Sequence, residues 1–142
     1  TAMEIPLEYV YFYPVASNDT WARDFGPITV QTEQGMTLLD FNFNGWGEKF
    51  KFDLDNAITQ KLYVQNAFPS AQHEPISFVL EGGSIESDGQ GTLLTTSSCL
   101  LNKNRNPNLS KDDIEQQLKK VFGVKKNTVI QIIYLKLFGL EK

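Results

Sequence analysis

The residue types that could do chemistry are concentrated in segment 18–27, with the sequence NDTWARDFGP. It places a Trp, an Arg and two Asp directly after a run of strand-forming residues, where loops commonly carry function. A carboxylate beside an indole can receive a planar cation, because it accepts two parallel N–H bonds from a guanidinium while the ring covers the cation's face. The competing interpretation is a structural ion pair between Arg23 and one Asp, with Trp21 in the core. The residues alone leave both open.

A second carboxylate of interest is Glu81, which follows an apolar run and precedes Gly82 and Gly83. These two glycines allow close backbone approach, and a glutamate placed there can orient a catalytic imidazole. The competing interpretation is an ordinary solvated Glu at a strand end with a bulge. The nearby glycines have neither the Gly-Lys-Ser/Thr ending nor the dinucleotide spacing of phosphate loops, so phosphate binding is not expected.

Trp46, His73 and Cys99 are the remaining residues with chemical potential. Segment 41–47, FNFNGWG, favours core positions for its two Phe and leaves Trp46 undecided. His73 lies among polar residues without a second ligand, so an exposed position without a role is expected. The apolar neighbours of Cys99 favour a buried small side chain over an activated thiolate.

Short strands and two amphipathic helices are expected to position these residues. Strands are predicted at Tyr9–Val15, 28–32, 38–43, 76–80, 84–86, 93–96 and 128–135. One helix is predicted over 53–67 from apolar residues at spacings of three and four, and another from Ser110 to Gly123, where Ser110 and Asp113 resemble a capping box. This order predicts an α/β fold with a recurring ββαβ-like unit of about sixty residues.

Length and composition limit the classes of protein that fit. The 142 residues are 41% hydrophobic and 21% charged, which predicts one compact domain and excludes general disorder. A formal net charge of −4 disfavours nucleic acid and permits a small cationic ligand. The single cysteine cannot form an internal disulfide, and no apolar run is long enough to span a membrane. A cytoplasmic protein without a membrane or nucleic-acid partner is therefore expected.

Three segments in order, 18–27, 41–47 and 80–86 (LEGGSIE), closely resemble the agmatine deiminase and bacterial peptidylarginine deiminase family. The resemblance covers roughly residues 8–130. It implies a pentein-type α/β propeller built from ββαβ modules around a central site. Residues 1–142 would then be a single partial deiminase domain of about two to three modules.

The resemblance also implies an activity, the hydrolysis of agmatine with water to N-carbamoylputrescine and ammonia, on the route to putrescine and polyamines. No cofactor and no metal are implied. In that chemistry a cysteine thiolate attacks the guanidinium carbon, a histidine transfers protons, and water hydrolyses the covalent intermediate. By motif, Asp24 matches a guanidinium-binding carboxylate and Glu81 the carboxylate that supports the histidine. Trp21 matches a wall of the substrate pocket, and Trp46 is expected at the same substrate site.

The sequence departs from the family pattern in three places. The first N-terminal module, the His-x-Asp motif and the segment with the nucleophilic cysteine have no counterpart, and the family pattern is lost past Thr128. Cys99 matches a structural cysteine of the family rather than the nucleophile. This chain alone is therefore expected to be inactive. The alternatives are an inactive fragment or guanidinium-binding module, or a deiminase of arginine or peptidyl-arginine. Exposed module faces would favour association of copies as a homo-oligomer.

Overall fold

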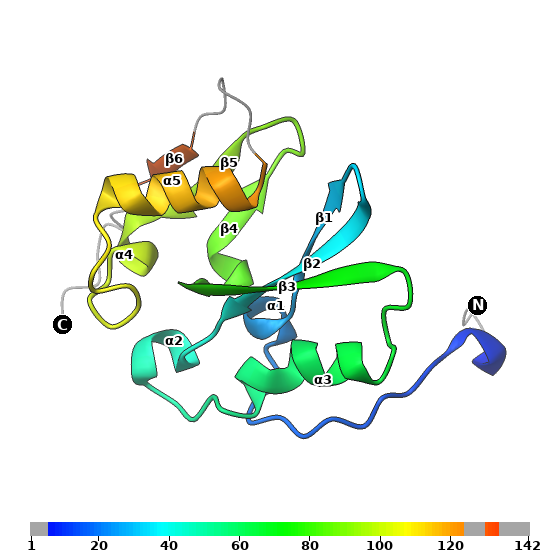
Figure 1. The fold of residues 1–142 in the computed structure, drawn as a ribbon. Coiled ribbons are helices and arrows are strands. Elements are labelled where there is room, and N and C mark those ends of the chain that lie inside the picture. Colours follow the sequence, from blue (N-terminus) through cyan, green and yellow to red (C-terminus); the bar gives the residue numbers. More distant parts are fainter. Residues whose placement is uncertain (1–5, 124–129, 134–142) are drawn as a thin grey trace, which may run out of the picture.

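The computed structural model of the chain describes residues 6–123 and 130–133. Over these residues the chain forms two ββαβ units in succession, each with its own three-stranded mixed sheet (Figure 1). In both units the first two strands are antiparallel, and the third strand returns parallel to the second. The α/β class and the recurring ββαβ unit predicted from the sequence are thus confirmed.

The elements of the first unit are, in chain order, β1 (Ile28–Thr32), β2 (Gly35–Asn42), α2 (Gly45–Glu48), η2 (Asp55–Ala57), α3 (Ile58–Val64) and β3 (Ala71–Val79). Those of the second unit are η3 (Gly82–Ser84), β4 (Ile85–Ser87), β5 (Leu93–Thr96), α4 (Ser97–Leu100), α5 (Lys111–Val121) and β6 (Ile130–Ile133). Two short turns of helix precede both units, η1 (Leu7–Tyr9) and α1 (Ala22–Phe25).

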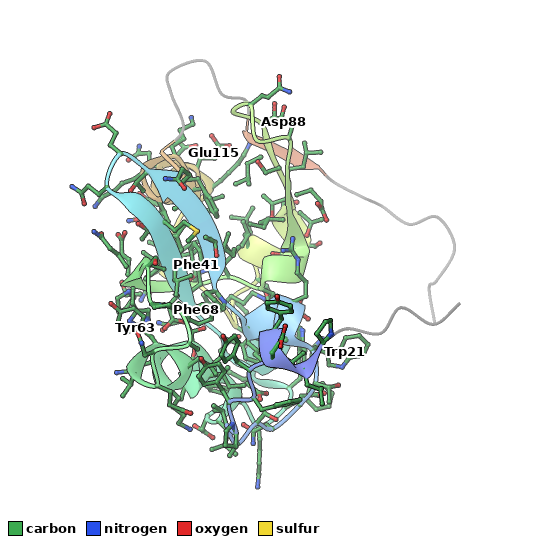
Figure 2. The ribbon with its side chains drawn as sticks, turned by 90° about the vertical axis from the view of Figure 1, so that its right-hand side faces the viewer. Trp21, Phe41, Tyr63, Phe68, Asp88 and Glu115 are labelled. Atoms are coloured by element: carbon green, nitrogen blue, oxygen red, sulfur yellow. The ribbon has the colours of Figure 1, made fainter. Side chains whose placement is uncertain are left out.

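The central strand β2 is buried on both of its faces. Successive side chains of a strand point to opposite faces, yet Leu38 and Leu39 are both buried. Helix α3 lies along one face of this sheet (Figure 1), while Leu39 and Phe41 join a cluster with Leu118 of α5 on the other. Figure 2 shows Phe41 in the interior, where its ring stacks on Phe122 with centroids 5.8 Å apart. The two units therefore share one hydrophobic core.

Helix α5 begins as its sequence predicts. The Ser110 hydroxyl accepts from the backbone N–H of Asp113 at 3.2 Å, and the Asp113 carboxylate accepts from the backbone N–H of Ser110 at 2.9 Å. This reciprocal capping box satisfies two amides at the helix start. Ile114 and Leu118, one turn apart, are fully buried and fix which face of α5 meets the sheets.

The strand predicted at Tyr9–Val15 is wrong. Only the turn η1 includes Tyr9, and residues 10–15 belong to no helix or strand. The large side chains of Tyr11 and Phe12 are exposed rather than buried. High β-propensity does not make a strand by itself, because a strand needs a neighbour to accept and donate its backbone hydrogen bonds. No strand among the described residues pairs with this segment.

Other predictions hold with shifted boundaries. The helix expected over 53–67 is shorter, with η2 followed by α3, which ends at Val64. The strand expected over 76–80 begins at Ala71 and passes through Pro75, which is tolerated because β3 is an edge strand. The strand expected over 84–86 is β4, and the one over 93–96 is β5. Of the strand expected over 128–135, the structure describes Ile130–Ile133 as β6, and the rest lies outside the described residues.

The structure also corrects the prediction for His73. Its side chain is only 11% exposed, and its Nε2 lies 2.7 Å from Oδ2 of Asp40, the diagonal neighbour on β2, two residues beyond its register partner Leu38. The ring of Tyr63 from α3 lies against the imidazole, with centroids 5.1 Å apart. The polar sequence neighbours of His73 gave no indication of this half-buried position. Alternate residues of the edge strand β3 face helix α3, so the residues next to His73 in sequence do not share its environment.

No helix in the described part of the chain is both long and apolar enough to cross a membrane.

Candidate functional site

Asp24 lies in the one-turn helix α1, immediately before the first strand of the first unit. Its Oδ2 accepts a 2.9 Å hydrogen bond from the indole Nε1–H of Trp46, and its Oδ1 accepts a 3.1 Å bond from the backbone N–H of Gly83. The side chain is half-buried. Each carboxylate oxygen has about two lone-pair directions, so acceptor capacity remains for the N–H groups of a cation.

Trp46 reaches Asp24 because the chain turns sharply around it. Trp46 has a φ of 58°, in the left-handed region that costs energy for a bulky residue, and it lies between Gly45 and Gly47, which also have positive φ. The side chain of Asn44 caps this turn by accepting from the backbone N–H of Gly47 at 3.0 Å. Strained backbone of this kind persists where the surroundings hold it and is frequent at functional sites.

The Trp46 ring is also fixed by aromatic packing. It meets the rings of Phe43 and Phe50 edge-on, with centroid distances of 5.0 and 5.7 Å. Phe43 is fully buried, as the sequence predicts for it. The Trp46 ring therefore packs against core aromatic residues and also donates to the carboxylate of Asp24.

Trp21 lies at the start of α1 and is 63% exposed. Figure 2 shows it at the edge of the molecule. The structure thus rules out the interpretation in which Trp21 fills the core. It also places no Arg23–Asp ion pair among the described residues, because the Arg23 guanidinium instead donates to the carbonyl of Ile85 at 3.3 Å. An exposed indole three residues from a half-buried carboxylate remains available to a ligand.

Glu81 is buried, with 3% of its surface exposed, so the interpretation as a solvated residue is wrong. Arg105, from the loop between α4 and α5, holds both oxygens of the carboxylate. Arg105 Nε lies 2.8 and 3.0 Å from the two oxygens, and Nη2 lies 2.8 Å from Oε1. A buried carboxylate requires such a partner, because an unpaired charge away from water is strongly unfavourable. The described histidine, His73, pairs elsewhere.

Gly82 and Gly83 bring the two carboxylate-bearing segments together. A Cβ at Gly82 would collide with the carbonyl of Arg23, and a Cβ at Gly83 would collide with Oδ1 of Asp24. The glycines predicted from the sequence to allow close backbone approach therefore do so, and the segment that approaches them is α1, which precedes the first unit. The turn after Glu81 thus lies directly against Asp24.

The family model of the Porphyromonas-type peptidyl-arginine deiminases matches residues 1–135. This chain belongs to that family.

Similar proteins agree with this membership. The agmatine deiminase of Medicago truncatula is 41% identical over 133 residues, which are 84% of this chain and 35% of that protein. The structure of the C. jejuni agmatine deiminase with substrate bound has a TM-score of 0.76 at 45% identity, covering 83% of this chain and 35% of that one. For the agmatine deiminase of Enterococcus faecalis the TM-score is 0.71 at 40% identity, covering 80% and 32%. The chain spans about a third of the length of these relatives.

The fold of this deiminase family is the pentein-type α/β propeller, so the two ββαβ units are part of such a propeller. In each unit, the candidate carboxylate stands just before the first strand: Asp24 before β1 and Glu81 before β4. The two residues therefore occupy corresponding places in the two ββαβ units. They belong to separate sequence motifs, and Gly83, two residues after Glu81, contacts Asp24.

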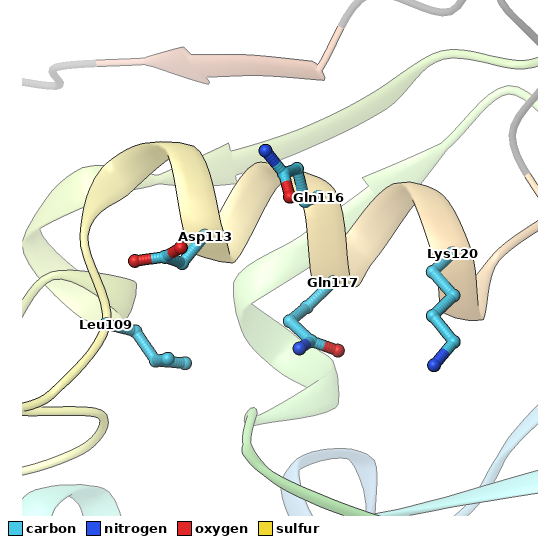
Figure 3. A pocket seen from close by; sticks show the side chains of 5 residues that line it. All are labelled: Leu109, Asp113, Gln116, Gln117 and Lys120. Carbon is cyan, nitrogen blue, oxygen red and sulfur yellow. The ribbon is translucent and has the colours of Figure 1, made fainter.

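A groove of about 750 Å³ extends from this region between β1 and β4, the edge strands of the two sheets. Arg23 lines it beside Asp24, and Thr29, Glu86 and Phe122 line it farther along. A separate open hollow of about 330 Å³ lies along α5 (Figure 3). Its lining consists of Leu109, Asp113, Gln116, Gln117 and Lys120. Trp21, Asp24, Trp46 and Glu81 line neither the groove nor this hollow, and the groove comes nearest to the candidate site at Arg23, the chain neighbour of Asp24.

Two residues that contribute to the site were not selected as functional from the sequence. Arg105 appears only inside a polar loop, and nothing local indicates its pairing with Glu81, 24 residues earlier. Asp55 is fully buried, and its Oδ1 accepts the backbone N–H groups of Asn18 and Asp19 at 2.6 and 3.1 Å. Asp55 therefore anchors the start of the segment that carries Asp24.

Cys99 lies in α4 and is half-buried, so it is less enclosed than the sequence predicts. None of the contacts described for Asp24, Trp46 or Glu81 involves Cys99.

Proposed function

We propose that the whole protein is a guanidine-modifying hydrolase of the agmatine deiminase type, and that this chain supplies its guanidinium-binding part. The reaction is agmatine plus water to N-carbamoylputrescine plus ammonia. The observation that carries the proposal is the carboxylate of Asp24, fixed by Trp46 and Gly83, with the exposed indole of Trp21 close by in the chain. Such a carboxylate can accept N–H bonds from a planar guanidinium.

In this proposal Asp24 binds the guanidinium nitrogens, and Trp21 and Trp46 line the substrate site. Glu81 supports the histidine that transfers protons. A cysteine thiolate attacks the guanidinium carbon, ammonia leaves, and water then releases the ureido product from the covalent intermediate. The thiolate and the histidine have no counterpart by motif in these 142 residues, so we expect binding by this chain but no turnover. Cys99 is not expected to replace the nucleophile.

The binding experiment is isothermal titration calorimetry of this chain with agmatine, arginine and putrescine. Putrescine is the matched control, because it keeps the alkyl chain and an amine but lacks the guanidinium. We expect agmatine to bind more tightly than arginine and putrescine to bind weakly or not at all. Asp24→Asn should remove the agmatine signal, since an amide cannot carry the compensating charge. Equal heats for agmatine and putrescine would contradict a guanidinium site at Asp24.

The activity experiment measures ammonia release from agmatine by this chain beside Cys99→Ser. We expect no release from either protein. Release that disappears in Cys99→Ser would make Cys99 the nucleophile and overturn the assignment of the missing machinery.

We further propose that residues 1–142 are one partial deiminase domain, that the whole protein acts in putrescine and polyamine synthesis, and that it is cytoplasmic. Exposed apolar side chains at Leu7, Tyr11 and Phe12 support association between copies of this chain. Light scattering tests that association, and a monomer at high concentration would contradict it.

A further inference from the structure

Three consecutive residues, Asn104, Arg105 and Asn106, contact three different parts of the candidate site. We propose that Arg105 is a positioning residue of this site: its guanidinium fixes Glu81 and lies against the turn that carries Trp46, and its two neighbours anchor it to the first unit. The inference deepens the proposed function, since it concerns the same site.

The first contact is the one between Arg105 and Glu81. Both side chains are buried, at 10% and 4% exposure, and the three N–O distances lie between 2.8 and 3.0 Å. A planar guanidinium that donates to both carboxylate oxygens fixes the rotation of the carboxylate as well as its charge. A lysine at this place would supply the charge without the planar set of donors.

The second contact joins this pair to the turn of the first unit. A Cβ at Gly47 would lie 3.3 Å from Nη1 of Arg105 and 3.4 Å from Cβ of Asn104, so the backbone of Gly47 lies against both residues. The side chain of Asn44 donates to the carbonyl of Asn104 at 2.6 Å and accepts from the N–H of Gly47 at 3.0 Å. Trp46 lies within the turn closed by these bonds. A change at Arg105 can therefore reach the Trp46–Asp24 bond.

The third contact fixes the backbone before Glu81. Oδ1 of Asn106 accepts from the N–H of Val79 at 3.0 Å, and Nδ2 of Asn106 donates to the carbonyl of Val79 at 2.9 Å. Val79 ends β3, two residues before Glu81. Asn106 thus fixes the backbone just before Glu81, and Arg105 fixes the Glu81 side chain. Together the two contacts restrict both the position and the orientation of the Glu81 carboxylate.

The test uses NMR spectroscopy of the intact 142-residue chain labelled with ¹⁵N. It follows the resonances of the two N–H groups that donate to Asp24, the indole N–H of Trp46 and the backbone N–H of Gly83. In Arg105→Lys we expect both resonances to shift, while the N–H of Asp113 at the start of α5 stays in place. Lys111→Gln is the matched control, because it removes the exposed 3.6 Å ion pair with Glu115 and should leave both resonances unchanged.

A second variant separates positioning from mere charge compensation. Glu81→Gln combined with Arg105→Gln removes both charges at once and leaves no unpaired ion in the interior. Shifted Trp46 and Gly83 resonances in this folded double variant would support positioning. Wild-type resonances in both the double variant and Arg105→Lys would overturn it, because Arg105 would then only neutralise Glu81.

Agmatine affinity gives an independent measure. If the chain binds agmatine, we expect the dissociation constant to rise about tenfold in Arg105→Lys, equivalent to about 1.4 kcal/mol. An unchanged constant in that case would overturn the inference. Failure of the wild-type chain to bind agmatine would contradict the proposed function, whereas the resonances would still decide whether Arg105 positions Trp46 and Asp24.

Discussion

The indole N–H of Trp46 donates a 2.9 Å hydrogen bond to Asp24 from 22 residues away in the sequence. The other oxygen of the same carboxylate accepts from Gly83 in the second ββαβ unit. Asp24 cannot rotate without losing a bond to one unit or the other. This arrangement presents a carboxylate of fixed orientation to a ligand.

Trp46→Phe should weaken both the fold and the site. A phenylalanine keeps an aromatic ring against Phe43 and Phe50 but cannot donate to Asp24. A hydrogen bond to a charged group contributes about 1.5–3 kcal/mol, so we expect the free energy of unfolding to fall by about 1.5 kcal/mol. Urea unfolding measures the change. Trp21→Phe is the control and should leave stability unchanged, because that indole is exposed; an equal loss in both variants would contradict the role of the bond.

Alanine substitutions at the paired glycines should have different consequences. Gly82→Ala places a methyl group against the rigid backbone carbonyl of Arg23 and should destabilise the chain by about 1–3 kcal/mol. Gly83→Ala places it against the side-chain oxygen of Asp24, which can move aside. We therefore expect little loss of stability but weaker agmatine binding in Gly83→Ala. Thermal unfolding and calorimetry on both variants test this, and identical behaviour would argue against the geometry.

Asp55→Ala should release the segment that leads to Asp24. The variant leaves the N–H groups of Asn18 and Asp19 without their acceptor, and a hydrogen bond to a charged group contributes about 1.5–3 kcal/mol. We expect a loss of about 2–4 kcal/mol in urea unfolding and faster hydrogen exchange at these two amides. Asp55→Asn keeps one acceptor oxygen and should lose less. Unchanged exchange in Asp55→Ala would show that the segment is held by other contacts.

The start of α5 should respond to acid through Asp113. Hydrogen bonds from the Ser110 side chain, and then from its backbone N–H, lower the pKa of Asp113 below its ordinary value. A lowered folded-state pKa adds stability above the unfolded-state pKa of about 4, and this stability is lost as the pH falls through the folded-state value. Asp113→Asn should therefore differ from wild type at pH 7 and converge with it in acid. A stability difference that stays constant from pH 7 into acid would contradict this role of the Asp113 carboxylate.

The N-terminal cap of the same helix gives a second measurement. Ser110→Ala removes the hydroxyl that accepts from the N–H of Asp113, and loss of an N-cap side chain typically costs about 1 kcal/mol. Urea unfolding at pH 7 measures it. A variant as stable as wild type would mean that solvent replaces the cap without cost.

Local sequence signals were sufficient where the structure is also local. The hairpin of β1 and β2 and the start of α5 at Ser110 both follow from residues next to one another in the chain. Asp24 and Glu81 were recognised from motifs, and the structure gives both a defined environment. Predictions failed where the outcome depends on distant neighbours. Residues 10–15 have strand propensity but no paired strand, and His73 has polar neighbours in sequence but Asp40 beside it in space.

The sequence by itself determined the α/β class, the ββαβ repeat and the deiminase family, because periodicity, caps, turns and motifs are properties of short segments. Only the tertiary structure decided that Trp46 and Gly83 hold Asp24 and that Arg105 holds Glu81. Those contacts join residues that are 22 to 59 positions apart. Their geometry depends on how the two units pack over a shared core, and no local pattern of residues encodes that packing.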